Sequence, residues 1–432
     1  ARHLAYRTLV VLLLLLFHDS QAHPLMARAV TNLTDPSLEK AGSGEEGRSS
    51  AGDGGARGAG SPQSGSAIVN FSQLAQVLLG RLQESGYALL FFCMVQRNEV
   101  FRRHCATRVD AETVLVPILE LLNQVPGAPG ASGQPDSGPT TAPEAPPVAT
   151  ALLLSLLALT SEASFCAAAS QKTLADGNRV LGHARPVRDA TLSSLLVAVL
   201  FRLAHWNFAS CRSAFFNRAA AGCLANLAVH GVERMHWHTA GRLIELTQLL
   251  ARNALRGKVS QQEAAAQDDA AAAAVAAADR HRTMMVRQIL AAATRLISSC
   301  LQGSRVARNG NLLYALQRAY PAQFIALETD SELGPALRHV RTAVDWFQAQ
   351  CPPGDGDSGA DDSDAQVARL EAAASRLPSS VDSLSAACGR SRFAFSETTN
   401  AAAFFLPEVW REARRLTPDH VCWNLPRTMR PS

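Results

Sequence analysis

Histidine and acidic residues that could together bind a metal are concentrated in one short stretch of the sequence. This stretch contains His230, Glu233, His236 and His238. On a helix, residues two positions apart are separated by about 200°, so His236 and His238 cannot share a face. His230 and Glu233 are three apart and could share one. A metal site would therefore need a loop here and a distant further ligand, and we interpret the cluster as surface histidines at a helix junction.

Other patterns of possible chemical interest lack the residues that their chemistry requires. Asp355, Asp357 and Asp361 begin like a calcium-binding loop, but the required glycine and the final glutamate are missing. Gly257-Lys258 lacks the upstream glycine of a phosphate-binding loop, and no Gly-x-Ser-x-Gly elbow occurs. The sequence therefore predicts no catalytic residue, no bound metal, no cofactor and no small-molecule substrate. We expect that the protein is not an enzyme.

One short segment points to partner binding. Ala221–Ala228 reads Ala-Gly-Cys-Leu-Ala-Asn-Leu-Ala, which resembles the third helix of an armadillo repeat. In that family the asparagine points into a concave groove and bonds the backbone of a bound peptide. An amide offers both donors and an acceptor, which suits this role. Asn226 is therefore a candidate partner-binding residue, and the alternative is a helix-surface asparagine with no role.

The elements that must position these residues are expected to be helices. Alanine is abundant and aromatic residues make up only 6% of the chain, which favours helices over strands. Apolar residues recur at helical spacing, and clean two-residue alternation is absent. The helical segments are 68–83, 87–105, 111–125, 151–159, 190–206, 219–229, 238–255, 284–301 and 333–347. Because short amphipathic helices must stack to bury their apolar faces, the sequence predicts an all-α armadillo/HEAT-like α-solenoid or a multi-helix array.

Low-complexity insertions divide this helical array. Their Gly, Pro, Ser and acidic residues bury too little apolar surface to offset the entropy cost of ordering. The alanine-rich insertion could instead form a solvent-exposed helix. The predicted order is 1–39, the start of the array; 40–66, an insertion; 67–125, helical; 126–148, a Pro/Gly-rich insertion; 149–256, armadillo-like; 257–278, the alanine-rich insertion; 279–350, helical; 351–364, an acidic linker; and 365–432, a carboxy-terminal helical segment.

The first residues allow two interpretations. Leu9–Phe17 followed by Ser20–Ala22 is typical of a signal peptide, and glycosylation sequons follow at Asn32 and Asn70. The other interpretation is a buried helix over Ala5–Phe17. The nine cysteines are odd in number, widely spaced and without a Cys-x-x-Cys motif, which favours a reducing compartment and the second interpretation.

The charge of the chain also limits the classes of molecule that we expect it to bind. The formal net charge is +4, which is small for 432 residues. Basic residues do not form the stripe that is typical of nucleic-acid-binding proteins. We therefore expect no nucleic-acid partner.

Several segments, taken in order, resemble the dymeclin family. Each is weak alone, but their order and spacing extend over most of the chain. They are the Leu/Val-rich opening with Asp19–Ala29, Arg108–Leu122, Gly222–Ala228 with Ala240–Leu250, Ile297–Leu301, Asn309–Leu316, Val344–Phe347, Phe404–Trp410 and Trp423-Asn424. The match looks like the carboxy-terminal two-thirds of the family. It predicts that the amino-terminal third, where members can carry an acylation signal, is missing from this chain.

The resemblance implies an all-helical protein of the cytoplasm that associates peripherally and reversibly with the Golgi apparatus. Its role would be a non-enzymatic scaffold or adaptor in Golgi organisation and vesicle trafficking. Its partners would be Golgi-associated proteins, with peripheral membrane contact. The alternative that remains is a secreted or lumenal glycoprotein with an amino-terminal signal peptide.

Overall fold

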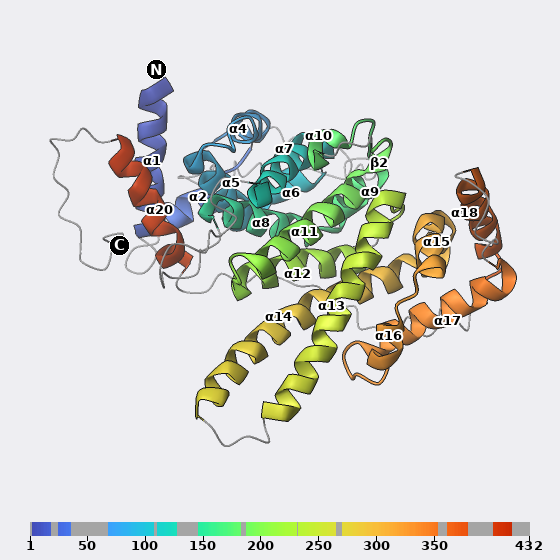
Figure 1. Ribbon diagram of the computed structural model, residues 1–432. Coiled ribbons are helices and arrows are strands. Elements are labelled where there is room, and N and C mark those ends of the chain that lie inside the picture. The colour runs from blue at the N-terminus through green and yellow to red at the C-terminus, as the bar shows by residue number, and fades with distance from the viewer. Residues whose placement is uncertain are drawn as a thin grey trace, which may run out of the picture. The chain divides into compact units, whose positions relative to one another are not determined.

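The computed structural model describes residues 2–18, 25–35, 68–107, 110–127, 146–182, 187–230, 232–264, 270–352, 361–378 and 401–416. These residues are almost entirely helical (Figure 1). They form two compact units, one of Ala1–Ala106 with Ser396–Ser432 and one of Thr107–Phe395. The all-α prediction is confirmed. Of the predicted insertions, 40–66 and most of 126–148 and 351–364 lie outside the described residues.

The first unit combines helices from both ends of the sequence. Its elements are α1 (Arg2–His18), α2 (Leu25–Thr31), α4 (Phe71–Leu79), α5 (Ser85–Arg97), α6 (Glu99–Thr107) and α20 (Ala401–Leu416). Helix α1 packs against α20 and α5. The Tyr6 hydroxyl donates to Glu412 Oε2 (3.1 Å) and accepts from the Gly86 amide (3.3 Å). Burial is the main cause that raises the pKa of Tyr6 to about 12, and the nearby Glu412 carboxylate contributes in the same direction. The hydroxyl therefore keeps its proton.

The buried-helix interpretation of the opening segment agrees with this packing. Leu13, Leu16 and Phe17 are almost fully buried. The Phe17 and Phe92 rings both lie against Phe405 of α20. The possible cleavage residues 20–22 lie outside the described residues. The apolar run is thus an element of the first unit's core.

The helix predicted over 87–105 is two helices, because Asn98 separates them. The Asn98 Oδ1 accepts from the Phe101 amide (2.7 Å), as an N-cap does at a helix start. Its Nδ2 donates to the carbonyls of Val30 (2.8 Å) and Leu33 (3.0 Å), which holds the end of α2 and the residues after it. Asn98 is fully buried. A polar residue in an apolar run therefore ends one helix and starts the next.

The second unit contains the remaining described elements. They are α7 (Ala111–Gln124), η1 (Val125–Gly127), α8 (Pro147–Thr160), α9 (Ala163–Gln171), β1 (Thr173–Leu174), α10 (Asn178–Leu181), β2 (Ala190–Thr191), α11 (Leu192–Ala209), α12 (Ala214–His230), α13 (Trp237–Ala264), α14 (Ala270–Cys300), η2 (Gly303–Arg308), α15 (Gly310–Arg318), α16 (Ala322–Leu327), α17 (Gly334–Gln350) and α18 (Asp361–Ala374). The two short strands, which the sequence did not predict, pair antiparallel with Thr173 opposite Thr191. Because β2 leads directly into α11, this pairing fixes the residues at the start of that helix.

Helix α11 is the central element of the second unit. It contacts α7, α9, α12 and α13, and most of its residues are buried. It is long and apolar enough to cross a membrane, as is the bent pair α8 and α9 with its 97° break. In α11, however, 72% of the apolar window is buried by the rest of the protein. This is what the core helix of a helical unit also shows, so the apolar composition is explained by packing.

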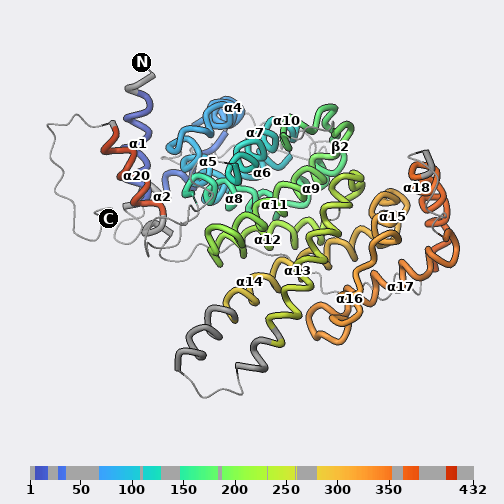
Figure 2. Tube along the Cα trace, in the orientation of Figure 1, coloured from blue at the N-terminus to red at the C-terminus, as the bar shows by residue number. Residues whose placement is uncertain are grey.

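Helices α13 and α14 extend further than their apolar periodicity predicts. The first helix was predicted to end at 255, whereas α13 continues to Ala264. The second was predicted to begin at 284, whereas α14 begins at Ala270. The two helices lie side by side (Figure 2). The described parts of the alanine-rich insertion are therefore helical, which agrees with the high helix propensity of alanine.

Candidate functional site

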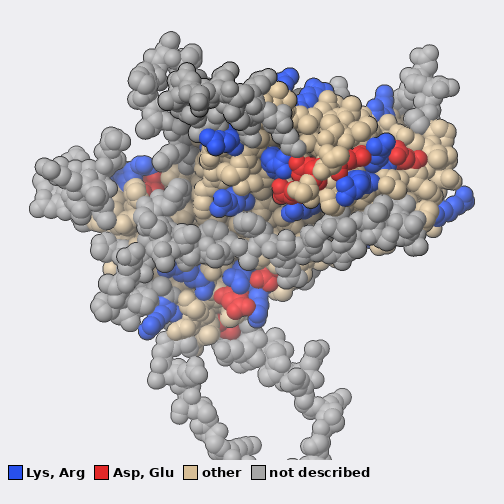
Figure 3. Space-filling view, turned by 90° about the horizontal axis from the view of Figure 1, so that it is seen from below, with Lys and Arg blue, Asp and Glu red and all other residues tan. Residues whose placement is uncertain are grey.

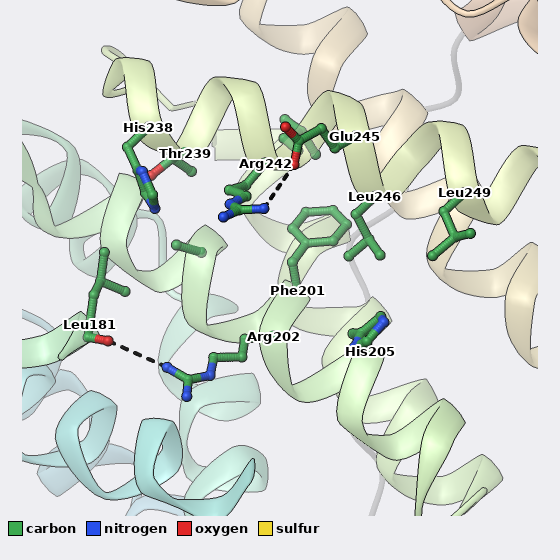
Figure 4. A pocket seen from close by; sticks show the side chains of 12 residues that line it. Leu181, Phe201, Arg202, His205, His238, Thr239, Arg242, Glu245, Leu246 and Leu249 are labelled. Atoms are coloured by element: carbon green, nitrogen blue, oxygen red, sulfur yellow. Dashed lines mark hydrogen bonds and ion pairs between the residues drawn. The ribbon is translucent and has the colours of Figure 1, made fainter. Parts of the chain in front are cut away.

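A groove lies between α11 and α13 (Figure 4). Its volume is about 380 Å³. The end of α10 closes one side. The lining residues are Leu181, Ala198, Phe201, Arg202, His205, His238, Thr239, Arg242, Leu243, Glu245, Leu246 and Leu249.

The floor of the groove is apolar because two amphipathic faces meet there. Phe201 of α11 and Leu243 of α13 are nearly fully buried, at 4% and 1% exposure. Leu249 lies further along α13 and remains 41% exposed. The groove therefore presents apolar surface to solvent at one end while its base belongs to the packed core.

Basic side chains line the rim of this floor. Arg202 and His205 come from α11, and His238 and Arg242 come from α13 (Figure 4). The only acidic lining residue is Glu245, whose Oε2 lies 3.0 Å from Arg242 Nη1. Both of these side chains are about two-thirds exposed, so their ion pair contributes little to stability. The groove thus combines an apolar floor with a mainly basic rim.

Arg202 is held in place by neutral acceptors. Its Nη1 donates to Asn123 Oδ1 (2.9 Å) and more weakly to the Leu181 carbonyl (3.4 Å). Neither partner neutralises the guanidinium charge. Arg202 therefore stays positioned on the rim and keeps its positive charge available to a ligand.

The first turn of α13 is fixed on the first turn of α11. The Ser194 hydroxyl accepts from the His236 amide (3.0 Å), and the Thr239 hydroxyl donates to the Ser194 carbonyl (3.4 Å). The Thr191 hydroxyl donates to the Arg234 carbonyl (2.9 Å). These bonds set the distance between the two helices at one end of the groove.

Asn309 fixes the loop that leads into α13. Its Oδ1 accepts from the Met235 amide (2.9 Å). Its Nδ2 lies within hydrogen-bonding distance of four carbonyls, those of Val232, Glu233, Cys300 and Arg305. The side chain is fully buried. Asn309 lies between η2 and α15.

The His/Glu cluster singled out in the sequence is spread over several roles. Glu233 pairs with Arg308 (2.6 Å), and the His230 carbonyl accepts from Arg305 (3.2 Å). His236 precedes α13, and His238 lies on the groove rim. Among the described residues, no three His, Cys, Asp or Glu side chains gather as metal ligands do. The cluster lies at the junction of α12 and α13, where His230, His236 and His238 are half-buried rather than surface residues.

His236 is poised to cap α13. Its Nδ1 accepts from the His238 amide (3.3 Å), which requires that this nitrogen carries no proton. Burial, helped by the charge of Arg234, lowers the pKa of His236 below its ordinary value. The neutral imidazole is therefore the form that fits this helix start.

Asn226, the candidate partner-binding residue, lies inside the helical packing. It is fully buried, and its Nδ2 donates to the Thr160 hydroxyl (3.3 Å) between α12 and α8. The side chain is not on the surface. A direct contact of Asn226 with a partner stays a prediction that this arrangement does not favour.

Charged side chains outside the groove are mixed in sign. On the face drawn in Figure 3, acidic side chains lie beside basic ones rather than apart from them. Arg287, for example, forms two bonds with Asp330, at 2.9 and 3.0 Å. Glu328 similarly pairs with Arg341 (3.1 Å). The groove rim carries two arginines, Arg202 and Arg242, and the single carboxylate of Glu245.

Comparison with known proteins settles the family. The model of the family described as "Dymeclin: Dyggve-Melchior-Clausen syndrome protein" matches residues 1–411. The chain belongs to the dymeclin family. It is 24% identical to dymeclin of Mus musculus over 65% of this chain and 39% of that protein, and 24% identical to dymeclin of Gallus gallus over 79% and 47%. Dymeclin of Drosophila melanogaster is 22% identical over 57% of this chain and 33% of its own.

This dymeclin-family chain spans less than half the length of the curated relatives it matches. No solved structure matches it. Membership of the family confirms the resemblance seen in the ordered sequence segments. The dymeclin family is not a known enzyme family.

The groove itself was not found from the sequence. Its residues lie on two helices that are each predicted, but the local sequence does not show that these two helices pack against each other. One signal was present: His238, Arg242, Glu245 and Leu249 recur at spacings of three and four, which places them on one face of a helix. That face mixes charge with an exposed leucine, which a face fully packed in a core would not show.

Proposed function

We propose that this chain is part of a non-enzymatic helical scaffold or adaptor in Golgi organisation and vesicle trafficking. It acts through protein–protein contacts, in the cytoplasm and peripherally on Golgi membranes. The match of the family model over residues 1–411 carries this proposal. The helices would stack in the armadillo/HEAT-like manner that the sequence pattern favours.

Two structural features support a role in binding rather than catalysis. The groove between α11 and α13 has an apolar floor with a basic rim, which suits recognition of another molecule. Of the titratable residues that the sequence singled out, His236 caps a helix and Glu233 forms an ion pair. A scaffold needs such fixed surfaces and no reactive group.

Localisation of the full-length native protein, tagged at its carboxy terminus, tests this proposal. We expect a Golgi-coincident signal that is partly cytosolic and is released from membranes by a carbonate wash. Protein that is sealed inside vesicles and shifts in mass after glycosidase treatment would contradict it. That result would favour the secreted or lumenal glycoprotein and would identify the opening helix as a signal peptide.

A further inference from the structure

The basic and apolar character of the groove continues along α13 beyond the cavity. Residues of α13 at alternating spacings of three and four fall within about 40° of one line along the helix. From the closed end outward, this row is His238, Arg242, Glu245, Leu249, Arg252 and Arg256. Arg252 and Arg256 are exposed, and neither forms an ion pair among the described residues. The row is about 27 Å long, from the rise of about 1.5 Å per residue.

The opposite wall comes from α11 and has the same character. Arg202 and His205 are exposed there, and Ala209 continues the same face toward the end of the helix. Two arginines, Arg202 and Arg242, thus line the groove beside the one carboxylate of Glu245. Arg252 and Arg256 continue the same face of α13 beyond it. An anionic ligand complements this surface in charge.

The walls of the groove also select the conformation of the ligand. Backbone groups in the middle of α11 and α13 are bonded within their own helices, so they offer few partners to an extended peptide. A helical ligand satisfies its own backbone and needs only side-chain complementarity, which is the helix-in-groove mode of recognition. The apolar floor suits residues spaced like helical i and i+3 or i+4 positions.

We propose that the groove between α11 and α13 docks an acidic amphipathic helix of about 18 residues from a partner protein. Its apolar side chains lie on Phe201, Leu246 and Leu249, and its carboxylates face the arginine row. This inference rests on the proposed scaffold function and adds the chemistry of the partner to it. It names a site that lies apart from Asn226.

Purified 432-residue chain and fluorescein-labelled peptides test the proposal by fluorescence anisotropy. The probe peptides are 18-residue helix formers with leucines on one face, in two leucine registers, and with glutamates beside them. Matched peptides carry lysine in place of every glutamate. We expect a glutamate peptide to bind at least about tenfold more tightly than its lysine counterpart, and its affinity to fall with rising salt.

Substitutions on the groove should remove this binding without changing the fold. Leu249→Glu and Arg242→Glu alter exposed side chains, so circular dichroism should be unchanged. Each should weaken the glutamate peptide by about tenfold or more, as expected for contacts at the centre of an interface. Arg242→Glu should also improve binding of the lysine peptide. Ile325→Glu and Arg218→Glu, which alter exposed residues of matching type outside the groove, should change affinity less than about twofold.

Three results would overturn the proposal. They are the absence of binding by both glutamate peptides, equal binding of glutamate and lysine peptides, and equal losses in the groove and control variants. Vesicles of phosphatidylserine and phosphatidylcholine provide the competing arm. Vesicle binding that depends on Leu249 and Arg242, without peptide binding, would assign the surface to membranes instead.

This test is separate from the test of the proposed function. A protein that fails to reach the Golgi apparatus would contradict the trafficking role but would leave the peptide affinities as measured. A groove that binds no acidic helix would leave the localisation result standing. Each outcome therefore identifies which of the two statements is wrong.

Discussion

At the residue scale, buried asparagines join the helices of this protein. Asn98 and Asn309 each bond several backbone groups at a point where one helix ends and another begins. Asn207 does the same at the α11–α12 corner, where it bonds both the amide and the carbonyl of Ser213 at 3.0 Å. These amides satisfy backbone groups that a helix end leaves without intrahelical partners.

Replacing Asn309 should therefore be costly. Asn309→Ala removes the acceptor of the Met235 amide and the two N–H donors that lie within reach of four carbonyls, all at a buried site. We expect a loss of about 3 kcal/mol in the free energy of unfolding, measured by urea denaturation. Asn311→Ala, which removes one longer bond to the Met235 carbonyl (3.3 Å), should cost about 1 kcal/mol or less. Equal effects would show that Asn309 is not the organising residue.

His236 should make stability depend on pH. Its folded pKa is lowered, so the unfolded chain binds the proton more readily. The stabilising contribution is present above the unfolded pKa of about 6.5 and is lost as pH falls from there through the folded pKa. His236→Asn keeps a capping acceptor and removes the titration, so its thermal midpoint should fall less than that of the wild type between pH 7.5 and 5.5. Parallel curves would refute this role.

Residue roles of this kind were only partly predictable. The sequence indicated that the His/Glu cluster lay at a helix junction, because its spacing fits no single helical face. It did not indicate that Asn226 would be buried, since the armadillo resemblance is local and burial depends on α8, which is distant in sequence. The bond of the His238 amide to the His236 ring is local, but histidine is not among the residues usually preferred at an N-cap, so the sequence did not indicate it.

At the element scale, helices were easier to predict than their ends. Apolar periodicity identified many of the longer helices because it follows directly from 3.6 residues per turn, but it did not identify the shorter α9, α15 and α16. It missed the break at Asn98, whose side chain caps α6 and also bonds the α2 segment, which is distant in sequence. It also ended α13 and α14 too early, because alanine carries helix propensity without periodicity.

The close approach of α13 and α14 gives a prediction about glycine. A Cβ added at Gly257 would lie 2.2 Å from Thr283 Oγ1, whereas one added at Gly241 of the same helix meets nothing within 4 Å. Gly257→Ala should therefore destabilise the protein by about 1–3 kcal/mol. Gly241→Ala should stabilise it by about 0.5–1 kcal/mol through helix propensity.

A double variant checks the cause of this difference. Combining Gly257→Ala with Thr283→Ala removes the obstructing side-chain atoms, so much of the lost stability should return. Thermal unfolding of the two single variants and the double variant measures this coupling. Strict additivity of the two changes would mean that the α13–α14 contact is not the cause.

At the scale of the whole molecule, the state of the cysteines distinguishes a protein of the reducing cytoplasm from one of the oxidising secretory pathway. Seven described cysteines are free, and all of them except Cys351 are buried. Burial raises the pKa of Cys300 to about 12, so its thiol is unreactive as well as inaccessible. This pattern suits a chain whose helices are held by packing rather than by covalent bonds.

Native alkylation should show this protection. With N-ethylmaleimide at neutral pH and peptide mapping by mass spectrometry, Cys351 should be modified first. The six buried cysteines should react only after denaturation, and a reductant should leave the thermal midpoint unchanged. Disulfide-linked peptides among these residues would contradict the structure and would favour the lumenal alternative.

The two compact units should also respond differently to loss of the last helix. Helix α20 completes the first unit, because Phe405 lies against Phe17 and Phe92 and because Glu412 accepts from Tyr6. Removing α20 exposes these apolar faces of α1 and α5 to water, and the unit loses part of the core on which its stability depends. The second unit, Thr107–Phe395, has its own core around α11 and contains no part of α20.

Limited proteolysis of a chain that ends at residue 395 tests this division. Cleavage within 2–106 should accelerate strongly compared with the full chain, because local unfolding of the first unit exposes its backbone. Cleavage within the described helices of 111–350 should keep its original rate. A single variant, Phe405→Ala, should produce the same pattern more weakly, since it removes one buried ring and leaves the rest of α20 in place. Equal acceleration in both regions would mean that the chain unfolds as one cooperative body, and that its carboxy-terminal helix stabilises the groove as well as the first unit.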